Sequence, residues 1–129
     1  MKYDNFLNQL KFDDKGLICA VIQDIENNDV LMVAYMNREA VEKTLAGPFV
    51  NFYSRSRNKM WIKGESSGHT QEVKEVYFDC DADCLLIKVI QKVAACHAGY
   101  RSCFYRQVVD GKPQIIAEKI FEEGTVYKK

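Results

Sequence analysis

The sequence lacks any run of about 20 apolar residues, the length that a helix needs to cross a membrane. Its first residues, MKYDNFLNQLKFDDKG, carry acids and amides every few positions and have no apolar stretch like that of a signal peptide. An excess of charge is also missing, since 18 basic residues balance 18 acidic ones. These absences predict a cytoplasmic protein and give no indication of a broad surface for nucleic acid or membranes.

Repeats, low-complexity segments and linkers are absent from the 129 residues, a length typical of one domain. The composition is 47% hydrophobic and 28% charged, which is enough apolar material for a core and a normal charge content for a soluble surface. We therefore expect residues 1–129 to form a single domain.

The periodicity of apolar residues predicts a β-rich α+β domain with a few short helices. Helices are predicted over 3–12 and from Arg38 to Gly47, the second capped by Asn37. Strands are predicted at 16–25, 30–36, 49–56, 60–64, 72–81 and 85–93, with a last hairpin of 103–109 and 114–116 around DGKP. The segments 65–71 and 95–103 are predicted loops, and the tail after 116 fits either a strand or a short helix.

Five cysteines, an odd number, argue against a disulfide framework and for metal binding or catalysis. Cys96 and Cys103 flank the loop CHAGYRSC, in which Gly99 lets the backbone bend enough to bring both sulfurs to one ion. Cys80 and Cys84 are the candidates for a third thiolate. Three protein ligands with one open position are typical of a catalytic zinc site. The alternative is that these cysteines are buried or merely reactive, and Cys19 is interpreted as a small buried hydrophobic residue.

Three aspartates alternate in FDCDADCLL at residues 78–86. In an extended strand, Asp79, Asp81 and Asp83 would share one face and Cys80 would lie on the other. Three neighbouring carboxylates repel each other unless a cation neutralises them, and hard oxygen ligands suit Mg²⁺. The alternative is a solvated acidic edge strand that resists aggregation.

A basic, hydroxyl-rich segment runs from 54 to 71, SRSRNKMWIKGESSGHTQ. Arg and Lys side chains together with hydroxyls and exposed N–H groups are what phosphate recognition requires. The candidate contacts are Arg55, Arg57, Lys63 and Ser67. Trp61, the only tryptophan, either stacks on a ring of the substrate or belongs to the core.

The chain has only two histidines, and both lie in predicted polar loops that contain glycine. His69 lies in the first of these loops, and His97 directly follows Cys96. A lone histidine is more often structural, but this placement favours acid/base work for the pair.

The stretches SRSRNKMWIKGESSGHTQEV, FDCDADCLLIKV and ACHAGYRSCFYR together closely resemble the phosphoribosyl-AMP cyclohydrolase family of histidine biosynthesis. They occur in the order and spacing of that family, and the resemblance covers most of the chain. The chain departs from the usual pattern at Val93, Ala94 and Ala98 without losing a ligand.

The resemblance implies a set of metal ligands shared between two chains. Asp79, Asp81 and Asp83 match magnesium ligands, and Cys96 and Cys103 match zinc ligands. Cys80 matches the third zinc ligand, which the neighbouring subunit supplies in that family. An intertwined homodimer with metal sites at its interface, one Zn²⁺ per subunit and Mg²⁺ are therefore expected, and Cys84 becomes a core or spare thiol.

The resemblance further implies hydrolytic opening of the adenine ring of 1-(5-phosphoribosyl)-AMP at the N1–C6 bond by zinc-activated water. His69 and His97 are the candidates for general base and acid. Some relatives carry a fused pyrophosphohydrolase domain, for which 129 residues leave no room, so a monofunctional form is expected. The alternative is a zinc-stabilised phosphate- or nucleotide-binding module without catalysis. A nucleobase zinc deaminase is disfavoured, because H-x-E and P-C-x-x-C are both missing.

Overall fold

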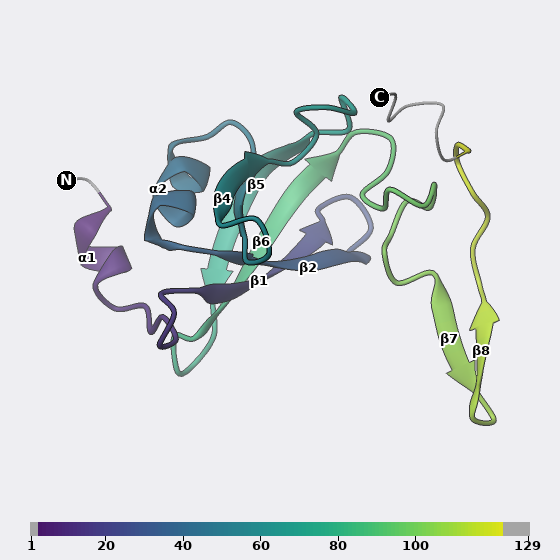
Figure 1. Ribbon diagram of the computed structural model, residues 1–129, viewed down its shortest axis with the longest axis horizontal. Coiled ribbons are helices and arrows are strands. Elements are labelled where there is room, and N and C mark those ends of the chain that lie inside the picture. Colours follow the sequence, from purple (N-terminus) through teal and green to yellow (C-terminus); the bar gives the residue numbers. More distant parts are fainter. Residues whose placement is uncertain (1–2, 123–129) are drawn as a thin grey trace.

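The computed structural model describes residues 3–122 and has two helices and eight strands in that range (Figure 1). In chain order these are α1 (Asp4–Leu7), β1 (Ile18–Asp24), β2 (Val30–Met36), α2 (Arg38–Ala46), β3 (Asn51–Ser54), β4 (Lys59–Ile62), β5 (Gln71–Phe78), β6 (Cys84–Gln91), β7 (Arg106–Val109) and β8 (Lys112–Ile115). The content is the small, β-rich α+β domain expected from the periodicity. No helix among the described residues is long and apolar enough to cross a membrane.

The central sheet has four strands in the order β2-β1-β6-β5. β1 pairs antiparallel with β2, β5 pairs antiparallel with β6, and the central pair β1 and β6 is parallel. The predicted hairpin of 16–25 and 30–36 is confirmed, as is the hairpin of β7 and β8 around Asp110 and Gly111. Both turn residues have positive φ, at 51° and 75°, as a two-residue hairpin turn requires.

One face of the central sheet forms the core. Alternate residues of β1 and β6 are fully buried on this face, namely Ile18, Ala20, Ile22, Leu85, Ile87 and Val89. Helix α2 and the β3–β4 hairpin contribute Val41 and Phe52 to the same cluster. As predicted, α2 begins after Asn37, whose side chain accepts a hydrogen bond from the Ala40 N–H at 2.8 Å, and it ends at Gly47.

The opposite face of the sheet keeps apolar side chains half exposed. Cys19, Val21 and Leu86 lie in its centre, while Val33 and Tyr77 are 43% and 46% exposed on the outer strands. The β7–β8 hairpin stands apart from the sheet, and its strand residues are all exposed (Figure 1). Both features leave apolar surface uncovered within the described chain.

The extended conformation predicted through 81 is wrong. β5 ends at Phe78, and Asp79 to Asp83 form the turn that leads into β6. The Asp79 carboxylate accepts the N–H groups of Asp83 and Cys84 at 3.0 and 3.2 Å, and Ala82 takes a positive φ of 62°. The aspartates therefore gather around a turn, and strand alternation does not separate them from Cys80.

Three smaller predictions also differ from the structure. The helix over 3–12 is limited to α1, because the Lys11 N–H donates to the Ala82 carbonyl at 2.8 Å and draws the chain to the aspartate turn. Cys19 is half buried rather than buried. The tail from 116 to 122 is neither strand nor helix. The Ile120 N–H donates to the Gly99 carbonyl at 2.7 Å, so the tail lies against the loop of Cys96 and Cys103.

Replacing Asn37 with alanine should lower the free energy of unfolding by about 1 kcal/mol, because the Ala40 N–H loses its acceptor. Chemical denaturation measures this difference. Asn37→Asp keeps a side-chain acceptor and serves as the control, and equal destabilisation by both changes would contradict the capping role.

Candidate active site

Cys96 and Cys103 lie together at the end of the sheet where β6 finishes. The backbone between them folds back on itself, with hydrogen bonds from Cys96 N–H to the Tyr100 carbonyl at 3.2 Å and from Gly99 N–H to the Cys96 carbonyl at 3.2 Å. The Cys103 N–H donates to the Leu31 carbonyl of β2 at 2.7 Å. Cys103 is exposed as a residue, but burial of its thiol group and the neighbouring Cys96 raise the pKa of that thiol to about 11. We call Cys96 and Cys103 the thiol pair, and its two sulfur donors fit a soft divalent ion such as zinc.

Gly99 is required in this loop because the chain approaches it closely. Its φ is 103°, and a Cβ atom here would clash with the carbonyl oxygen of Phe121. The tail thus covers the loop at the one residue that offers no side chain.

Lys63 is buried beside the thiol pair. The residue is 8% exposed, and its ammonium donates a hydrogen bond to the Ala95 carbonyl at 2.5 Å. Burial lowers the pKa of Lys63, and the negative charge of Cys103 and Cys96 opposes that shift. Lys63 was expected to bind phosphate, but its ammonium lies beside the thiol pair. Lys63 also borders a surface hollow together with Ser67.

His69 belongs to the same cluster. It is 6% exposed, and its ring lies edge-on to Phe121 with a centroid separation of 5.1 Å. Its Nδ1 atom is buried without a hydrogen-bond partner in the described structure. Burial, reinforced by the charge of Lys63, lowers the pKa of His69 below its ordinary value of 6.5. The imidazole is therefore neutral at pH 7 and able to accept a proton.

The backbone around His69 is tightly packed. Gly64 has a φ of 86°, and a Cβ atom there would lie 2.6 Å from the carbonyl carbon of His69. The Ser67 hydroxyl accepts the His69 N–H at 3.1 Å. His97 differs from His69, because its side chain is exposed next to Cys96.

The three aspartates meet at the β5–β6 turn. One oxygen of each of Asp79, Asp81 and Asp83 lies within 4.8 Å of the other two. A hydrogen bond with Asp81 is the main cause that raises the pKa of Asp83. Burial acts to raise the pKa of Asp79, but the N–H groups of Asp83 and Cys84 outweigh it and lower that pKa. Carboxylates that share protons in this way are crowded, and their oxygens fit a hard cation such as Mg²⁺.

Cys80 lies in the aspartate turn and is exposed. In the part of the chain that the structure describes, it does not approach Cys96 and Cys103 closely enough to form a group of three ligands. Cys84 does not join them either. It lies opposite Cys19 across the parallel pair β1 and β6, and burial and this neighbour raise its pKa to about 11.

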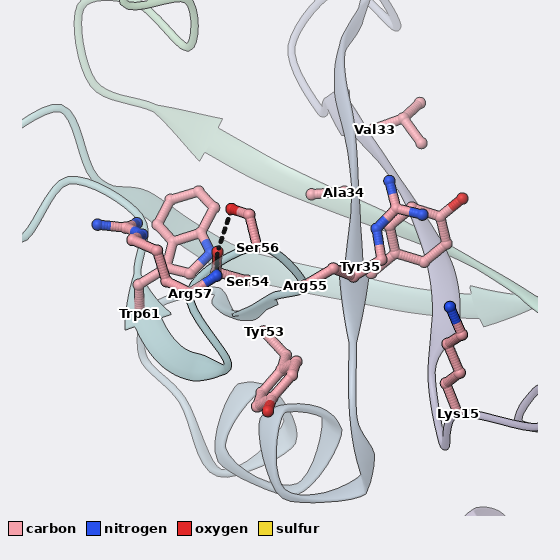
Figure 2. Close-up of a pocket in the computed structure, with 10 residues that line it drawn as sticks. All are labelled: Lys15, Val33, Ala34, Tyr35, Tyr53, Ser54, Arg55, Ser56, Arg57 and Trp61. Carbon is pink, nitrogen blue, oxygen red and sulfur yellow. Dashed lines mark hydrogen bonds between the residues drawn. The ribbon is translucent and has the colours of Figure 1, made fainter.

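Arg55 and Arg57 line a hollow of about 680 Å³ on the β3–β4 hairpin (Figure 2). The Arg55 guanidinium lies 4.1 Å from the centroid of the Tyr35 ring. The hydroxyls of Ser54 and Ser56 are 3.4 Å apart at its other side. Arg57 and Trp61 also line a smaller hollow that contains Lys63 and Ser67, so the two hollows adjoin. Trp61 packs against Phe52, and it also lines both hollows.

Tyr35 and Lys15 line the larger hollow without having been singled out in the sequence. Tyr35 lies in β2 among apolar residues, and Lys15 lies in the turn before β1. Only the tertiary arrangement brings them to the β3–β4 hairpin, so no local signal identifies them.

Comparison with known proteins gives a consistent result. Residues 32–105 match the family model for phosphoribosyl-AMP cyclohydrolase. The chain is 53% identical over 126 residues to a phosphoribosyl-AMP cyclohydrolase from Chlorobium phaeovibrioides, covering 97% of this chain and 92% of that protein. It is 55% identical over 115 residues to one from Methanosarcina barkeri, covering 89% and 87%.

A third relative is longer. The chain is 50% identical over 125 residues to a histidine biosynthesis bifunctional protein from Thermoanaerobacter pseudethanolicus, and it spans 58% of the length of that protein. The family model and the two single-activity relatives agree with the resemblance of the three sequence motifs. The chain therefore belongs to the phosphoribosyl-AMP cyclohydrolase family, a family of hydrolases of histidine biosynthesis.

Proposed function

We propose that the chain opens the adenine ring of 1-(5-phosphoribosyl)-AMP by hydrolysis of the N1–C6 bond. The observation that carries this proposal is the cluster at the end of β6, where two cysteines, a buried lysine and a neutral histidine come together. Zinc, when bound by three cysteines, supplies Lewis-acid activation of water at neutral pH. The two single-activity relatives are named as cyclohydrolases, which favours catalysis over a binding module without chemistry.

The zinc ligands are proposed to come from two chains. β6 runs from Cys84 to Gln91, so about 23 Å of strand separates the turn of Cys80 from the loop of Cys96. A zinc ion with bonds of about 2.3 Å cannot span that separation. The site of Cys96 and Cys103 is therefore completed by Cys80 of the partner subunit.

A homodimer also accounts for the surface that one chain leaves uncovered. The half-exposed apolar face of the central sheet, with Val33 and Tyr77, and the exposed strands of the β7–β8 hairpin are suited to contact a second copy. Obligate homodimers commonly bury such apolar surface, and a two-fold axis makes each chain give and receive the same contacts. An intertwined homodimer with one zinc per subunit follows.

Either Cys80→Ala or Cys103→Ala should abolish activity and bound zinc, because each homodimer then lacks one ligand in both sites. Co-expression of the two variants should recover about a quarter of wild-type activity, since half of the randomly formed dimers contain one intact site. Activity and zinc content of the purified mixture provide the measurement.

Two differently tagged Cys103→Ala chains serve as the control and should not complement each other. If the Cys80 and Cys103 variants also fail to complement after heterodimers have been isolated through two tags, the shared site is excluded. Full activity of Cys103→Ala would exclude the thiol pair altogether.

His69 is proposed as the general base. The lowered pKa keeps its imidazole neutral at pH 7, and the unpartnered Nδ1 lies buried near Lys63, which itself borders the thiol pair. His97, exposed beside Cys96, is the proposed acid that protonates the departing N1.

His69→Asn should lower kcat by about 100-fold or more, because general base catalysis contributes about that much. The change should leave the zinc content unaltered, because His69 is not one of the proposed zinc ligands. His97→Asn tests the proposed acid by the same measurements. Normal turnover of a folded His69→Asn enzyme would remove His69 from the mechanism.

The two adjoining hollows are proposed to hold the substrate, which carries a phosphate on each of its two ribose groups. Arg55 and Arg57 offer fixed charges and hydrogen-bond donors to one phosphate. Ser67 and Lys63 border the other hollow, toward the thiol pair. Mg²⁺ on Asp79, Asp81 and Asp83 is proposed to bring a further positive charge to the substrate at the dimer interface.

Arg55→Gln should raise KM by about tenfold or more with a smaller effect on kcat, because a charged hydrogen bond to phosphate is lost. Steady-state kinetics measure the split between the two constants. Arg38→Gln, on the surface of α2 and outside the hollow, should leave both constants unchanged. A KM equal to that of the wild type in Arg55→Gln would place the phosphate elsewhere.

A further inference from the structure

Arg101 lies between the two cysteines of the thiol pair in sequence and is anchored on a buried carboxylate. Its Nη2 atom donates to Oδ2 of Asp24 at 2.7 Å, and the Asp24 side chain is 1% exposed. The other carboxylate oxygen of Asp24 accepts the Glu26 N–H at 2.9 Å. Asp24 is the last residue of β1, so the ion pair fixes the guanidinium to the end of a central strand.

The same guanidinium also binds the backbone that leads into Cys96. Nη1 donates to the Val93 carbonyl at 3.0 Å, and Nη2 lies 3.4 Å from the Gln91 carbonyl. The Arg101 carbonyl in turn accepts the Ala95 N–H at 2.8 Å. Arg101 therefore holds the segment 91–95 through both its side chain and its backbone.

The backbone conformation of Val93 shows why this segment needs stabilising contacts from other residues. Its φ is 61°, in the left-handed region that a β-branched side chain strongly disfavours. Such a residue persists only when the surrounding contacts determine its conformation. The hydrogen bond from Arg101 to the Val93 carbonyl is one of these contacts, three residues before Cys96.

We propose that Arg101, anchored on Asp24, is a positioning residue that holds the thiol pair in the geometry in which it binds metal. The inference rests on the metal site of the proposed function. Arg101 does not contact the metal, the substrate or the reacting atoms. It acts through the backbone of residues 91–95 on one side of the loop, while the bond from Cys103 to Leu31 fixes the other side.

The guanidinium is needed for this role because one planar group reaches three oxygens in different directions. An ammonium in its place can neutralise Asp24 but cannot keep the same fork of bonds to Val93 and Gln91. Arg101→Lys therefore keeps a positive charge beside Asp24 but removes the hydrogen bonds that position the loop.

The test measures zinc affinity of the full-length protein by competition with a chromophoric chelator, together with the thiolate-to-metal absorption of the Co²⁺-loaded form. Arg101→Lys should bind zinc about 10- to 100-fold more weakly than wild type, as is typical when a group that supports a metal ligand is lost. Its Co²⁺ absorption should change while its melting temperature stays close to that of the wild type.

Arg38→Gln is the matched control, since this arginine lies on the exposed surface of α2, where it bonds Asn8. It should match wild type in both measurements. If Arg101→Lys does not fold, the same comparison is made on the double variant Arg101→Gln with Asp24→Asn, which leaves no unpaired carboxylate at the end of β1. A folded Arg101 variant with zinc affinity within about twofold of the wild type and an unchanged Co²⁺ spectrum would overturn the inference.

The wild-type measurement keeps the two proposals apart. A wild-type protein that binds no zinc contradicts the proposed metal site itself. A wild-type protein that binds zinc, together with variants that bind it equally well, contradicts only the role of Arg101.

Discussion

The length of strand β6 is the constraint on which the arrangement of the candidate site depends. β6 pairs in parallel with β1 on one side and antiparallel with β5 on the other, so its position within the sheet is fixed. The aspartate turn lies before its first residue and the thiol pair lies beyond its last. A buried strand with both neighbours in place cannot bend to bring its ends together. One chain therefore offers hard oxygen donors at one end and soft sulfur donors at the other, and the zinc site proposed above draws on two chains for this reason.

The electrostatics at the thiol end are organised around buried charge. Lys63 is almost fully buried. Its ammonium donates to the Ala95 carbonyl and lies near the two thiols. An ammonium in this position is stabilised by negative charge on the sulfurs. The same ammonium helps to keep His69 neutral. The charge of one lysine thus acts on both the thiol pair and His69, although the sequence context of that lysine had indicated phosphate recognition.

Local patterns predicted the features that depend on local physics. Asn37 before REAVEKTLAG, the β-branched residues of β1, and the glycine turn at Asp110 and Gly111 each specify structure within a few residues. The gathering of Asp79, Asp81 and Asp83 was also predicted, but from strand geometry that does not occur. A turn in which Asp79 binds the N–H groups of Asp83 and Cys84 achieves it instead. Alternation alone cannot distinguish these cases, because the side-chain hydrogen bonds that stop a strand leave no period in the sequence.

Features that depend on contacts between residues far apart in the chain could not be predicted from the sequence. The pair of Arg101 and Asp24 joins residues 77 positions apart. Tyr35 lies in the strand before α2 in the sequence, whereas Arg55 follows the strand after α2. Neither partner carries a local signal, since an arginine in a loop and an aspartate at a strand end are common. The parallel pairing of β1 with β6 likewise became evident only in three dimensions.

The contact between Gly99 and the tail has a consequence for the order in which the protein is made. The Gly99 carbonyl accepts the N–H of Ile120, and Phe121 lies over both this glycine and the ring of His69. During synthesis, the loop with both sulfurs leaves the ribosome well before the residues that cover it. For that interval the loop lacks its contact with residues 120 and 121, and His69 lacks its aromatic neighbour.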